Sequence, residues 1–358
     1  MSPREVSPME VLPTEMNRQW ILKRRPRGEL GADDFSWTTS PIPEPNDGEF
    51  LVRNLCFSCD PTQRGWAAND TYFKAVRIGD VMRAFAVGEV ITSRDPRYQP
   101  GQLLQGLFGW QDYALSSQAH EFPLMPVPDG VAIETALSML GNTGITAYFG
   151  LLEVGAAKPG ETLVVSGAAG ATGSTVGQIG KIIGCRVVGL AGGAEKCRYL
   201  IEELGFDAAI DYKSENIMTR LRQLCPRGID VYYDNVGGRI LDAALANLAM
   251  RGRIVICGAI SAYNDAGGAE GPRNYLKLLI MRGRMEGFVV VDYMHRADEA
   301  LRALGGWLRE GRLKDRVDVQ HGLENAPAVL NRLFSGKNQG KQLLEIAKPS
   351  RQRPGPAS

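Results

Sequence analysis

Residues 162–173 of this chain read TLVVSGAAGATG, a short apolar run followed by a turn rich in glycine. The run lies between Gly160 and Gly167 and predicts a buried strand, with a helix of small residues expected from Gly173 to Gly184. Glycines at such a turn let a backbone approach a pyrophosphate closely, and the start of the helix attracts the anion. The spacing is GxxGxxG and not the standard GxGxxG, so the prediction of dinucleotide binding depends on the flanking pattern.

The sequence downstream of this turn alternates between apolar runs and helical stretches. Further strands are predicted at residues 186–191, 208–210, 229–233 and 253–257. Helices are predicted at residues 195–204, 217–224 and 239–248. Strands and helices of these lengths are typical of βαβ units, so we expect an α/β fold with a doubly wound parallel sheet.

The regions before and after these βαβ units have a different pattern of apolar and turn residues. Short apolar runs broken by turn residues predict a compact β-rich domain, with strands at residues 19–22, 49–53, 85–91 and 103–107. A final strand is predicted at residues 341–346. Residues 1–15 lack the apolar run of a signal peptide and are expected to be a disordered extension, as is the tail at residues 349–358, which is rich in Pro, Ser and Arg.

Composition limits the class of protein. At 358 residues the chain predicts two or three domains, and its apolar fraction of 44% is ordinary for a globular protein. A formal net charge of +1 gives no reason to expect nucleic acid or an anionic membrane as a partner. No apolar run reaches the length of about 18 residues that a membrane span needs. The six cysteines are scattered, which indicates reduced thiols and a cytoplasmic location.

The sequence gives little support for a metal site or a nucleophilic triad. Cys56 and Cys59 form a single CxxC pair without a second pair, whereas a structural zinc site needs four ligands. The three histidines, His120, His295 and His321, are far apart in the sequence and form no HxxxH or CxxH unit. We therefore expect no bound metal and no Ser-His-Asp or Cys-His arrangement.

The end of the second predicted strand distinguishes between the two nicotinamide dinucleotides. An NAD site would place Asp or Glu there to bind the ribose hydroxyls. The chain instead has Gly192 and Gly193, which leave room for a phosphate, and Lys196, which can neutralise it. Glu195 comes later and is interpreted as an acid in the first turn of a helix. We therefore expect NADPH, with a simple surface lysine as the alternative interpretation of Lys196.

Several segments, taken together and in order, resemble one family. The chain resembles the zinc-independent branch of the medium-chain dehydrogenase/reductase superfamily, which includes prostaglandin reductases, plant alkenal double-bond reductases and bacterial curcumin-reductase-like enzymes. The resemblance extends from Arg18 to Ala347. It rests on residues 55–64 (LCFSCDPTQR), 109–113, 144–150, 168–181, 191–196, 233–238, 257–264, 285–288 and 336–341.

This resemblance implies a GroES-like β-rich domain at residues 16–141 and 317–348, with a Rossmann domain at residues 142–316 inserted between its two parts. Gly170 and Gly173 would line the pyrophosphate, Lys196 and Tyr212 would contact the 2′-phosphate, and Asn235 would lie at the nicotinamide end. The full set of implied NADPH-binding residues is Asn142, Thr146, Ala169, Gly170, Ala171, Thr172, Gly173, Gly192, Lys196, Tyr212, Asn235, Cys257, Ala259, Ile260, Ser261, Tyr263, Phe288, Val289, Val290 and Asn338.

The resemblance also implies the chemistry and the substrate side of the site. Tyr263 matches the tyrosine that the family places near the substrate carbonyl, and Tyr72 and Asn264 would lie in the substrate pocket. When hydride adds to the β-carbon of an enal or enone, negative charge develops on the carbonyl oxygen, and a phenol hydroxyl stabilises that enolate. The alternative for Tyr263 is a loop tyrosine that only packs.

Two departures from the family pattern and two other functions stay open. Thr62 stands where relatives usually have tyrosine, and Asn142 stands where they often have methionine, so the shape of the pocket does not transfer directly.

A quinone reductase needs the same hydride delivery and oxyanion stabilisation. A non-catalytic NADPH-binding protein is the alternative of a different class. Family members are often homodimers that extend a sheet across both subunits, and residues 253–258 could begin such an edge.

Overall fold

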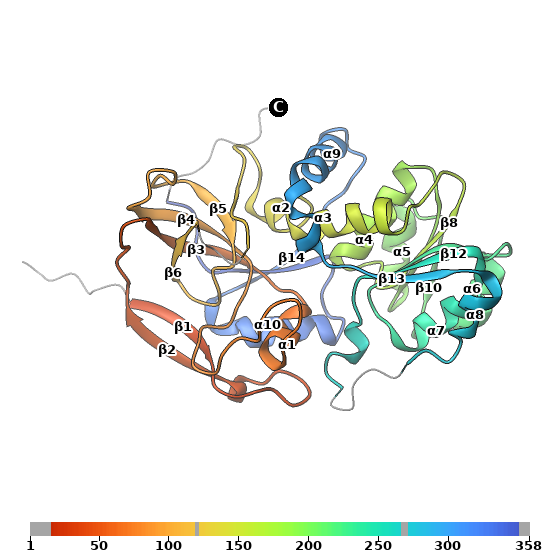
Figure 1. Cartoon of the computed structure of the whole chain (residues 1–358), viewed down its shortest axis with the longest axis horizontal. Helices are drawn as coiled ribbons and strands as arrows, with labels where there is room; N and C mark the ends of the chain where they lie inside the picture. Colours follow the sequence, from red (N-terminus) through yellow and green to blue (C-terminus); the bar gives the residue numbers. More distant parts are fainter. Residues whose placement is uncertain (1–15, 119–121, 266–270, 351–358) are drawn as a thin grey trace, which may run out of the picture.

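Residues 162–173 form the first strand, turn and helix of a six-stranded parallel sheet. The computed structural model describes residues 16–118, 122–265 and 271–350, in which two lobes lie side by side (Figure 1). The strands of the parallel sheet are β8 (Thr162–Val165), β9 (Arg186–Ala191), β10 (Ala208–Asp211), β11 (Ile229–Asp234), β12 (Leu248–Ile256) and β13 (Arg284–Gly287). Their order is β10-β9-β8-β11-β12-β13, so the winding reverses between β8 and β11. Ligands of doubly wound sheets bind beyond the carboxyl ends of the strands at such a reversal.

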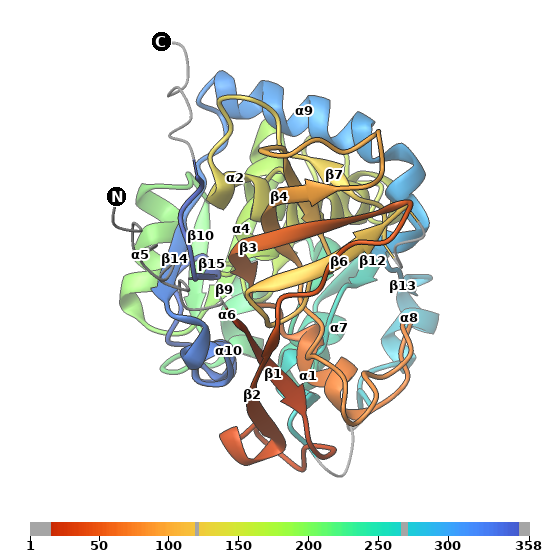
Figure 2. The ribbon, with the colours of Figure 1, turned by 90° about the vertical axis from the view of Figure 1, so that its left-hand side faces the viewer.

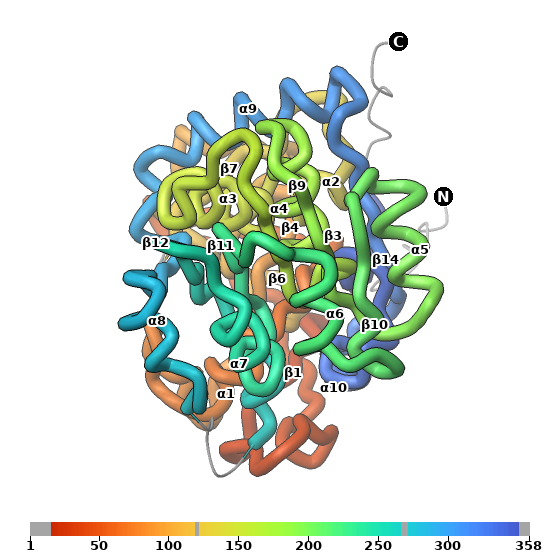
Figure 3. The backbone as a smooth tube through the Cα atoms, turned by 90° about the vertical axis from the view of Figure 1, so that its right-hand side faces the viewer, coloured from red at the N-terminus to blue at the C-terminus, as the bar shows by residue number. Residues whose placement is uncertain are grey.

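Helices cover both faces of this sheet because its central strands, β8, β9 and β11, bury side chains on both sides. Leu163 and Val165 of β8 pack into one hydrophobic cluster, whereas Val164 between them packs into another. The first cluster lies under α3 (Asn142–Phe149), α4 (Ala171–Ile182), α5 (Ala194–Glu202) and α9 (Ala297–Arg309). The second lies under α6 (Ile217–Leu224), α7 (Gly238–Ala246) and α8 (Leu276–Met281), which Figure 3 shows from outside. Alternation with a period of two residues places neighbouring side chains on opposite faces.

The other lobe is a mixed sheet that uses both ends of the chain. Its strands are β3 (Glu49–Ser58), β4 (Ala86–Ser93), β5 (Leu103–Gly106), β6 (Tyr113–Ser117), β7 (Met125–Pro126), β14 (Val317–His321) and β15 (Lys341–Glu345). The strand β15 pairs antiparallel with β3 and parallel with β14, which attaches the C-terminal strands to the N-terminal sheet (Figure 2). A separate hairpin and three helices complete the lobe: β1 (Met16–Leu22), β2 (Phe35–Pro41), α1 (Thr62–Ala68), α2 (Ile133–Leu137) and α10 (Ala326–Phe334).

The structure agrees with the predicted α/β fold and differs in some elements. The strand at residues 186–191 and the helix at residues 217–224 have the predicted bounds. The elements that were not predicted include β2, β6, β7, β13, β14, α1, α2, α3, α8, α9 and α10. Residues 253–258 were expected to begin a sheet edge, which is wrong, because β12 is flanked by β11 and β13. The boundaries between the domains stay a prediction.

The extension at residues 1–15 and residues 351–358 of the tail lie outside the described residues. Within the tail, Ser350 donates hydrogen bonds from N and Oγ to Glu89 at 2.9 and 2.7 Å, so residues 349 and 350 lie against the β-rich lobe. Among the helices of the described ranges, none combines the length and the apolar character needed to cross a bilayer.

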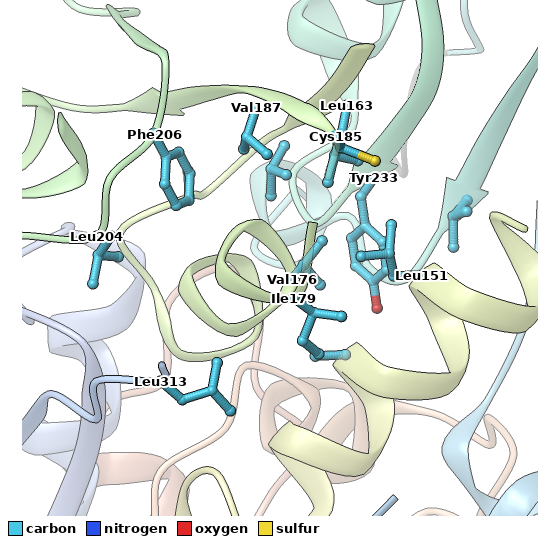
Figure 4. Packing of buried hydrophobic residues seen from close by; sticks show 14 of the residues in the cluster. Leu151, Leu163, Val176, Ile179, Cys185, Val187, Leu204, Phe206, Tyr233 and Leu313 are labelled. Atoms are coloured by element: carbon cyan, nitrogen blue, oxygen red, sulfur yellow. The ribbon is translucent and has the colours of Figure 1, made fainter. Parts of the chain in front are cut away.

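Close packing of α4 on the sheet depends on small residues. A β-carbon placed at Gly177 would lie 1.9 Å from Cζ of Phe206, and one placed at Gly180 would lie 2.5 Å from Cδ2 of Leu163. Figure 4 shows Phe206 and Leu163 in the cluster that surrounds this helix. Any larger side chain at these positions would push α4 away from the strands that carry the glycine-rich turn.

We expect Gly177→Ala to lower the free energy of unfolding by about 1–3 kcal/mol, because the added methyl group overpacks against Phe206. The measurement is equilibrium urea unfolding. Gly306→Ala is the matched control: Gly306 is also inside a helix, α9, and its β-carbon would meet nothing within 4 Å. It should be neutral or stabilising by up to about 1 kcal/mol. Equal effects of the two substitutions would contradict the packing argument.

Candidate functional site

The predicted cofactor residues follow the carboxyl ends of all six parallel strands. Residues 167–173 come after β8, and Gly192 and Tyr212 come after β9 and β10. Asn235 and Cys257 come after β11 and β12, and Phe288, Val289 and Val290 come after β13. Because parallel strands end at the same edge of a sheet, the topology brings residues separated by more than a hundred positions to one edge.

The turn between β8 and α4 is closed by contacts between its own backbone atoms. Gly167 has a φ of +58°, and a β-carbon at Gly173 would lie 2.4 Å from the carbonyl oxygen of Gly167. Gly170 is the N-cap of the 12-residue helix α4, and no side chain caps the helix there. Ala169, Ala171 and Thr172 complete the turn. An uncapped helix start that carries only small residues is suited to receive a pyrophosphate.

A second turn, after β9, gathers two lysines and a tyrosine. A β-carbon at Gly192 would lie 2.6 Å from the hydroxyl of Tyr212 and 3.0 Å from Cε of Lys213. Burial lowers the pKa of Lys196, and the charge of Lys213 lowers that pKa further. The two ammonium groups are therefore near enough to repel each other, an arrangement that a bound anion would relieve. The sequence analysis did not include Lys213 among the cofactor-binding residues. Its position just after the third strand of the parallel sheet would have indicated it.

The carboxylate of Asp211 is engaged by backbone amides of this turn and of the loop after β10. Asp211, at the end of β10, accepts hydrogen bonds from N of Gly193 at 2.8 Å and from N of Lys213 at 3.0 Å. The bond from Gly193 is the main reason that the pKa of Asp211 is lowered. The strand β9 itself ends at Ala191 without an acid. The ribose-binding carboxylate typical of NAD sites is thus missing at the position where it would be expected.

Residues 336–341 of the β-rich lobe cross both turns, and we call them the 336–341 segment. Lys196 donates from Nζ to the carbonyl of Gly336 at 2.9 Å. Gly340 donates from N to the carbonyl of Ala169 at 3.2 Å and forms a parallel bridge with Gly170. Asn338 donates from Nδ2 to the carbonyl of Gly340 at 2.9 Å. The predicted Asn338 therefore supports the segment that contacts the turn after β8.

Asn235 is fixed by a buried hydrogen-bond network that the sequence did not reveal. It donates from N to Oγ of Ser166 at 2.9 Å and from Nδ2 to the carbonyl of Ser166 at 2.7 Å. Asp234 is 1% exposed, and its Oδ1 accepts hydrogen bonds from Ser166, Tyr232 and the amides of residues 236 and 237. Burial raises the pKa of Asp234. The sequence did contain a signal for this network: Ser166 and Asp234 are polar residues at the ends of apolar strands.

Tyr263 is held over the ends of β11 and β12 by its own loop. The hydroxyl of Tyr263 accepts a hydrogen bond from N of Ala259 at 3.2 Å and lies 3.2 Å from the β-carbon position of Gly258. Ser261 donates from Oγ to the carbonyl of Val236 at 2.6 Å, and Ile260 donates from N to the carbonyl of Asn235 at 3.3 Å. Burial raises the pKa of Tyr263, so the phenol keeps its proton at neutral pH and can donate it.

The helix α3 forms the wall beside Cys257 and Phe288. Tyr233 donates from its hydroxyl to the carbonyl of Thr146 at 3.2 Å, and its ring meets the ring of Phe288 edge-on at 6.4 Å. Thr146 donates from Oγ1 to the carbonyl of Asn142 at 2.7 Å. Oδ1 of Asn142 is buried, and no group in the described part of the chain donates to it.

The predicted substrate-side residues, Tyr72 and Asn264, make few contacts with the predicted cofactor-binding residues. Tyr72 shares a hydrogen bond of 2.8 Å with Oγ1 of Thr62, and enclosure of its hydroxyl raises its pKa to about 12. Smaller contributions to this pKa come from Tyr263 and Cys257, which places the two tyrosines within electrostatic reach of each other. Oδ1 of Asn264 is buried and has no donor among the described residues. No hydrogen bond in the described structure connects Tyr72, Tyr263 and Asn264.

The cysteines and histidines do not gather. Cys56 and Cys59 are buried in different hydrophobic clusters, and all six cysteines are free thiols. Within residues 16–118, 122–265 and 271–350, no group of three or more His, Cys, Asp or Glu side chains is placed to hold a metal ion. His120 lies outside these ranges.

Comparisons with known proteins agree with this geometry. Residues 18–124 match the family model described as the N-terminal domain of oxidoreductase, and residues 171–305 match the one described as zinc-binding dehydrogenase. The NADPH-dependent curcumin reductase of Escherichia coli is 42% identical over 340 residues, which cover 93% of this chain and 98% of that protein. The chain belongs to the medium-chain dehydrogenase/reductase superfamily. Within it, the chain lies in the branch of curcumin, alkenal and prostaglandin reductases.

Two further relatives support the same place in this superfamily. The NADP(+)-dependent 2-alkenal reductase of Nicotiana tabacum is 39% identical and covers 93% of this chain and 98% of its own length. The crystal structure of CurA from Vibrio vulnificus in complex with NADPH matches with a TM-score of 0.86 at 40% identity and covers 93% of this chain and all of that one. The medium-chain fold is therefore shared over nearly the whole length.

We expect the thiol of Cys257 to be a poor nucleophile at neutral pH, because burial raises its pKa to about 11. Its alkylation by iodoacetamide, followed by mass spectrometry of the peptide, should become about tenfold faster per pH unit through the mildly alkaline range. The same cysteine in the urea-unfolded chain should level off near the ordinary pKa of 9.0. A plateau at neutral pH in the folded protein would contradict the raised pKa.

Proposed function

We propose that this protein uses NADPH to reduce the carbon–carbon double bond of α,β-unsaturated aldehydes and ketones. Family membership makes it an NADP-dependent oxidoreductase that acts on such bonds, and the choice of enals and enones as substrates is the finer step. One observation carries the proposal: the Tyr263 hydroxyl is held by N of Ala259 at the carboxyl ends of β11 and β12. Cytoplasmic location is part of the proposal, supported by the six free thiols.

The residues present fit NADPH at three places. Uncapped amides at the start of α4 suit the pyrophosphate, and the lysine pair with Tyr212 suits a 2′-phosphate. Beside α3, the buried Oδ1 of Asn142 is an acceptor without a donor among the described residues, which suits a carboxamide N–H. Bound NADPH would supply the hydride for the reaction.

The residues of the chain would orient the substrate and stabilise charge. Tyr263 accepts from Ala259 and keeps its own O–H for a second acceptor, which we assign as the substrate carbonyl oxygen. As the β-carbon gains hydride, this oxygen becomes an enolate, and a fixed donor stabilises it more than the ground-state carbonyl. The Asp234–Ser166 network would keep Asn235 in place during the step. A proton then completes the product at the α-carbon.

Two other functions stay as alternatives. Quinone reduction uses the same donor and the same geometry, so an enal, a long-chain enone and a benzoquinone should be assayed side by side. Non-catalytic binding of NADPH is disfavoured by the ordered placement of Tyr263. Binding without oxidation across all three substrates would instead support it.

We expect Tyr263→Phe to lower kcat for an enone by about a hundredfold, because one donor to the developing enolate is lost. The dissociation constant of NADPH, measured by fluorescence, should change by less than about twofold. Tyr98→Phe is the control, since Tyr98 packs on Phe50 in the β-rich lobe at a ring distance of 4.3 Å. Unchanged turnover in Tyr263→Phe would remove its catalytic role.

The proposal includes a homodimer formed through β13. This strand is the last of the parallel sheet, and all four of its residues are exposed. On the neighbouring α8, Leu279 is 76% exposed, and Leu276 and Ile280 are also more than half exposed. Antiparallel pairing of two copies about Met285 would set Arg284 opposite the partner's Glu286. An open edge with apolar neighbours and complementary charges favours a second copy as the partner.

We expect Glu286→Arg to weaken the dimer by about tenfold or more, because two arginines would then face each other across the interface. Sedimentation velocity measures this, and the double variant Arg284→Glu/Glu286→Arg should recover the dimer. Glu310→Arg is the control, because Glu310 pairs with Arg312 beyond the end of α9. A monomeric wild type, or a dimer unaffected by Glu286→Arg, would contradict this assembly.

A further inference from the structure

The first turn of α5 carries charges of both signs beside the proposed phosphate site. Lys196 is joined there by Lys213 from the loop after β10. Glu195 precedes Lys196 in the same helical turn, and its charge also acts on Lys196. A free carboxylate at this position would pair with the ammonium groups and would repel a phosphate dianion. The affinity for a 2′-phosphate therefore depends on where Glu195 is held.

Gln339 of the 336–341 segment holds Glu195. Its amide donates from Nε2 to Oε1 of Glu195 at 2.7 Å. The side-chain oxygen Oε1 of Gln339 accepts a hydrogen bond from Nη2 of Arg316. The backbone N of Gln339 donates to Oδ2 of Asp318 at 3.2 Å. Because both ends of the amide and the backbone are engaged, the side chain presents its N–H group to Glu195 in one orientation.

The partner of Gln339 is itself fixed. The guanidinium carbon of Arg316 lies 4.5 Å from the centroid of the Tyr199 ring on α5. Nη1 of Arg316 is 3.9 Å from Oε1 of Glu203, just beyond the end of α5. The chain of contacts thus runs from Glu203 through Arg316 and Gln339 back to Glu195, at the start of the same helix. It connects the β-rich lobe to the charge of a single carboxylate.

We propose that Gln339 is a specificity-determining residue that keeps Glu195 from competing with a 2′-phosphate for Lys196 and Lys213. The inference rests on the proposed NADPH function and adds a residue from the opposite lobe to its selectivity. Gln339 acts through Glu195 and is therefore a positioning residue. Gln339 would favour NADPH over NADH by holding the negative charge of Glu195 away from the 2′-phosphate. It need not contact the phosphate itself.

The experiment measures binding of 2′,5′-ADP and of 5′-ADP by calorimetry, which needs no turnover. Gln339→Ala should weaken 2′,5′-ADP by about threefold to tenfold, the range expected for one unshielded charge near the surface, and leave 5′-ADP unchanged. Gln339→Glu should weaken 2′,5′-ADP more, because it places a second carboxylate beside Glu195. In 1 M salt, where the Debye length is about 3 Å, the loss should largely disappear.

Removal of the Glu195 carboxylate shows whether Gln339 acts by positioning Glu195 or only by supporting the structure. In Gln339→Ala/Glu195→Gln the affinity for 2′,5′-ADP should return to that of Glu195→Gln alone. Gln223→Ala is the matched control, since the side chain of Gln223 also accepts a hydrogen bond from an arginine, Arg220, at 2.8 Å within α6. It should bind both nucleotides like the wild type, and melting temperatures should be compared for all variants.

Three results would overturn the inference. If Gln339→Ala weakens both nucleotides equally, or if the loss persists in the double variant, then Gln339 supports the segment without controlling the charge. If the wild type fails to prefer 2′,5′-ADP over 5′-ADP, the NADPH assignment falls together with the inference. The first pair of outcomes leaves the proposed function intact, so the two failures are distinguishable.

Discussion

The site depends on one close approach, in which α4 begins almost in contact with the end of β8. At Gly173 a β-carbon would sit 2.4 Å from a backbone oxygen, so the turn closes only because no side chain is present. This closure directs the start of a 12-residue helix at the carboxyl edge of the sheet. The small residues along α4 then allow the helix to stay close to the strands, with Phe206 packed beneath it. The remaining strand ends line up beside this fixed turn.

The second constraint comes from the other lobe. The 336–341 segment contacts the turns after β8 and β9 through Gly340 and Gly336, so both turns are held by residues of the other lobe. The segment leads directly into β15, which pairs with β3 in the mixed sheet. The contact between the lobes thus joins residues that are far apart in the sequence, and its geometry follows from both sheets.

Much of the parallel sheet could be predicted because its signals are local. The apolar run between Gly184 and Gly192 gave β9, and the helical stretch at residues 217–224 gave α6, both with their observed bounds. The absence of an acid after β9 pointed to a phosphate. The strand β13 could not be found in this way, because its four residues are exposed and lack an apolar run. It is a strand only because β12 offers a partner for its backbone.

The parts of the site that were missed depend on contacts between distant residues. Asp234 becomes a fixed acceptor only when β8 brings Ser166 beside it. Lys213 approaches Lys196 only through the turn that Asp211 stabilises, and Gln339 meets Glu195 only when the two lobes join. Periodicity and residue type along the chain carry no information about these neighbours. Resemblance to a family implied the residues at the strand ends, whereas the hydrogen-bond network that holds them depends on the folded chain.

The neighbouring lysines after β9 have a consequence for the energetics of association. Burial and mutual repulsion favour the neutral amine of Lys196 in the free protein, whereas an arriving dianion favours the charged form. The proposed binding of a 2′-phosphate beside Lys196 would therefore be coupled to proton uptake wherever the free protein holds part of Lys196 as the amine. Affinity falls as the solution becomes more alkaline than this lowered pKa, and the observed heat depends on the ionisation enthalpy of the buffer.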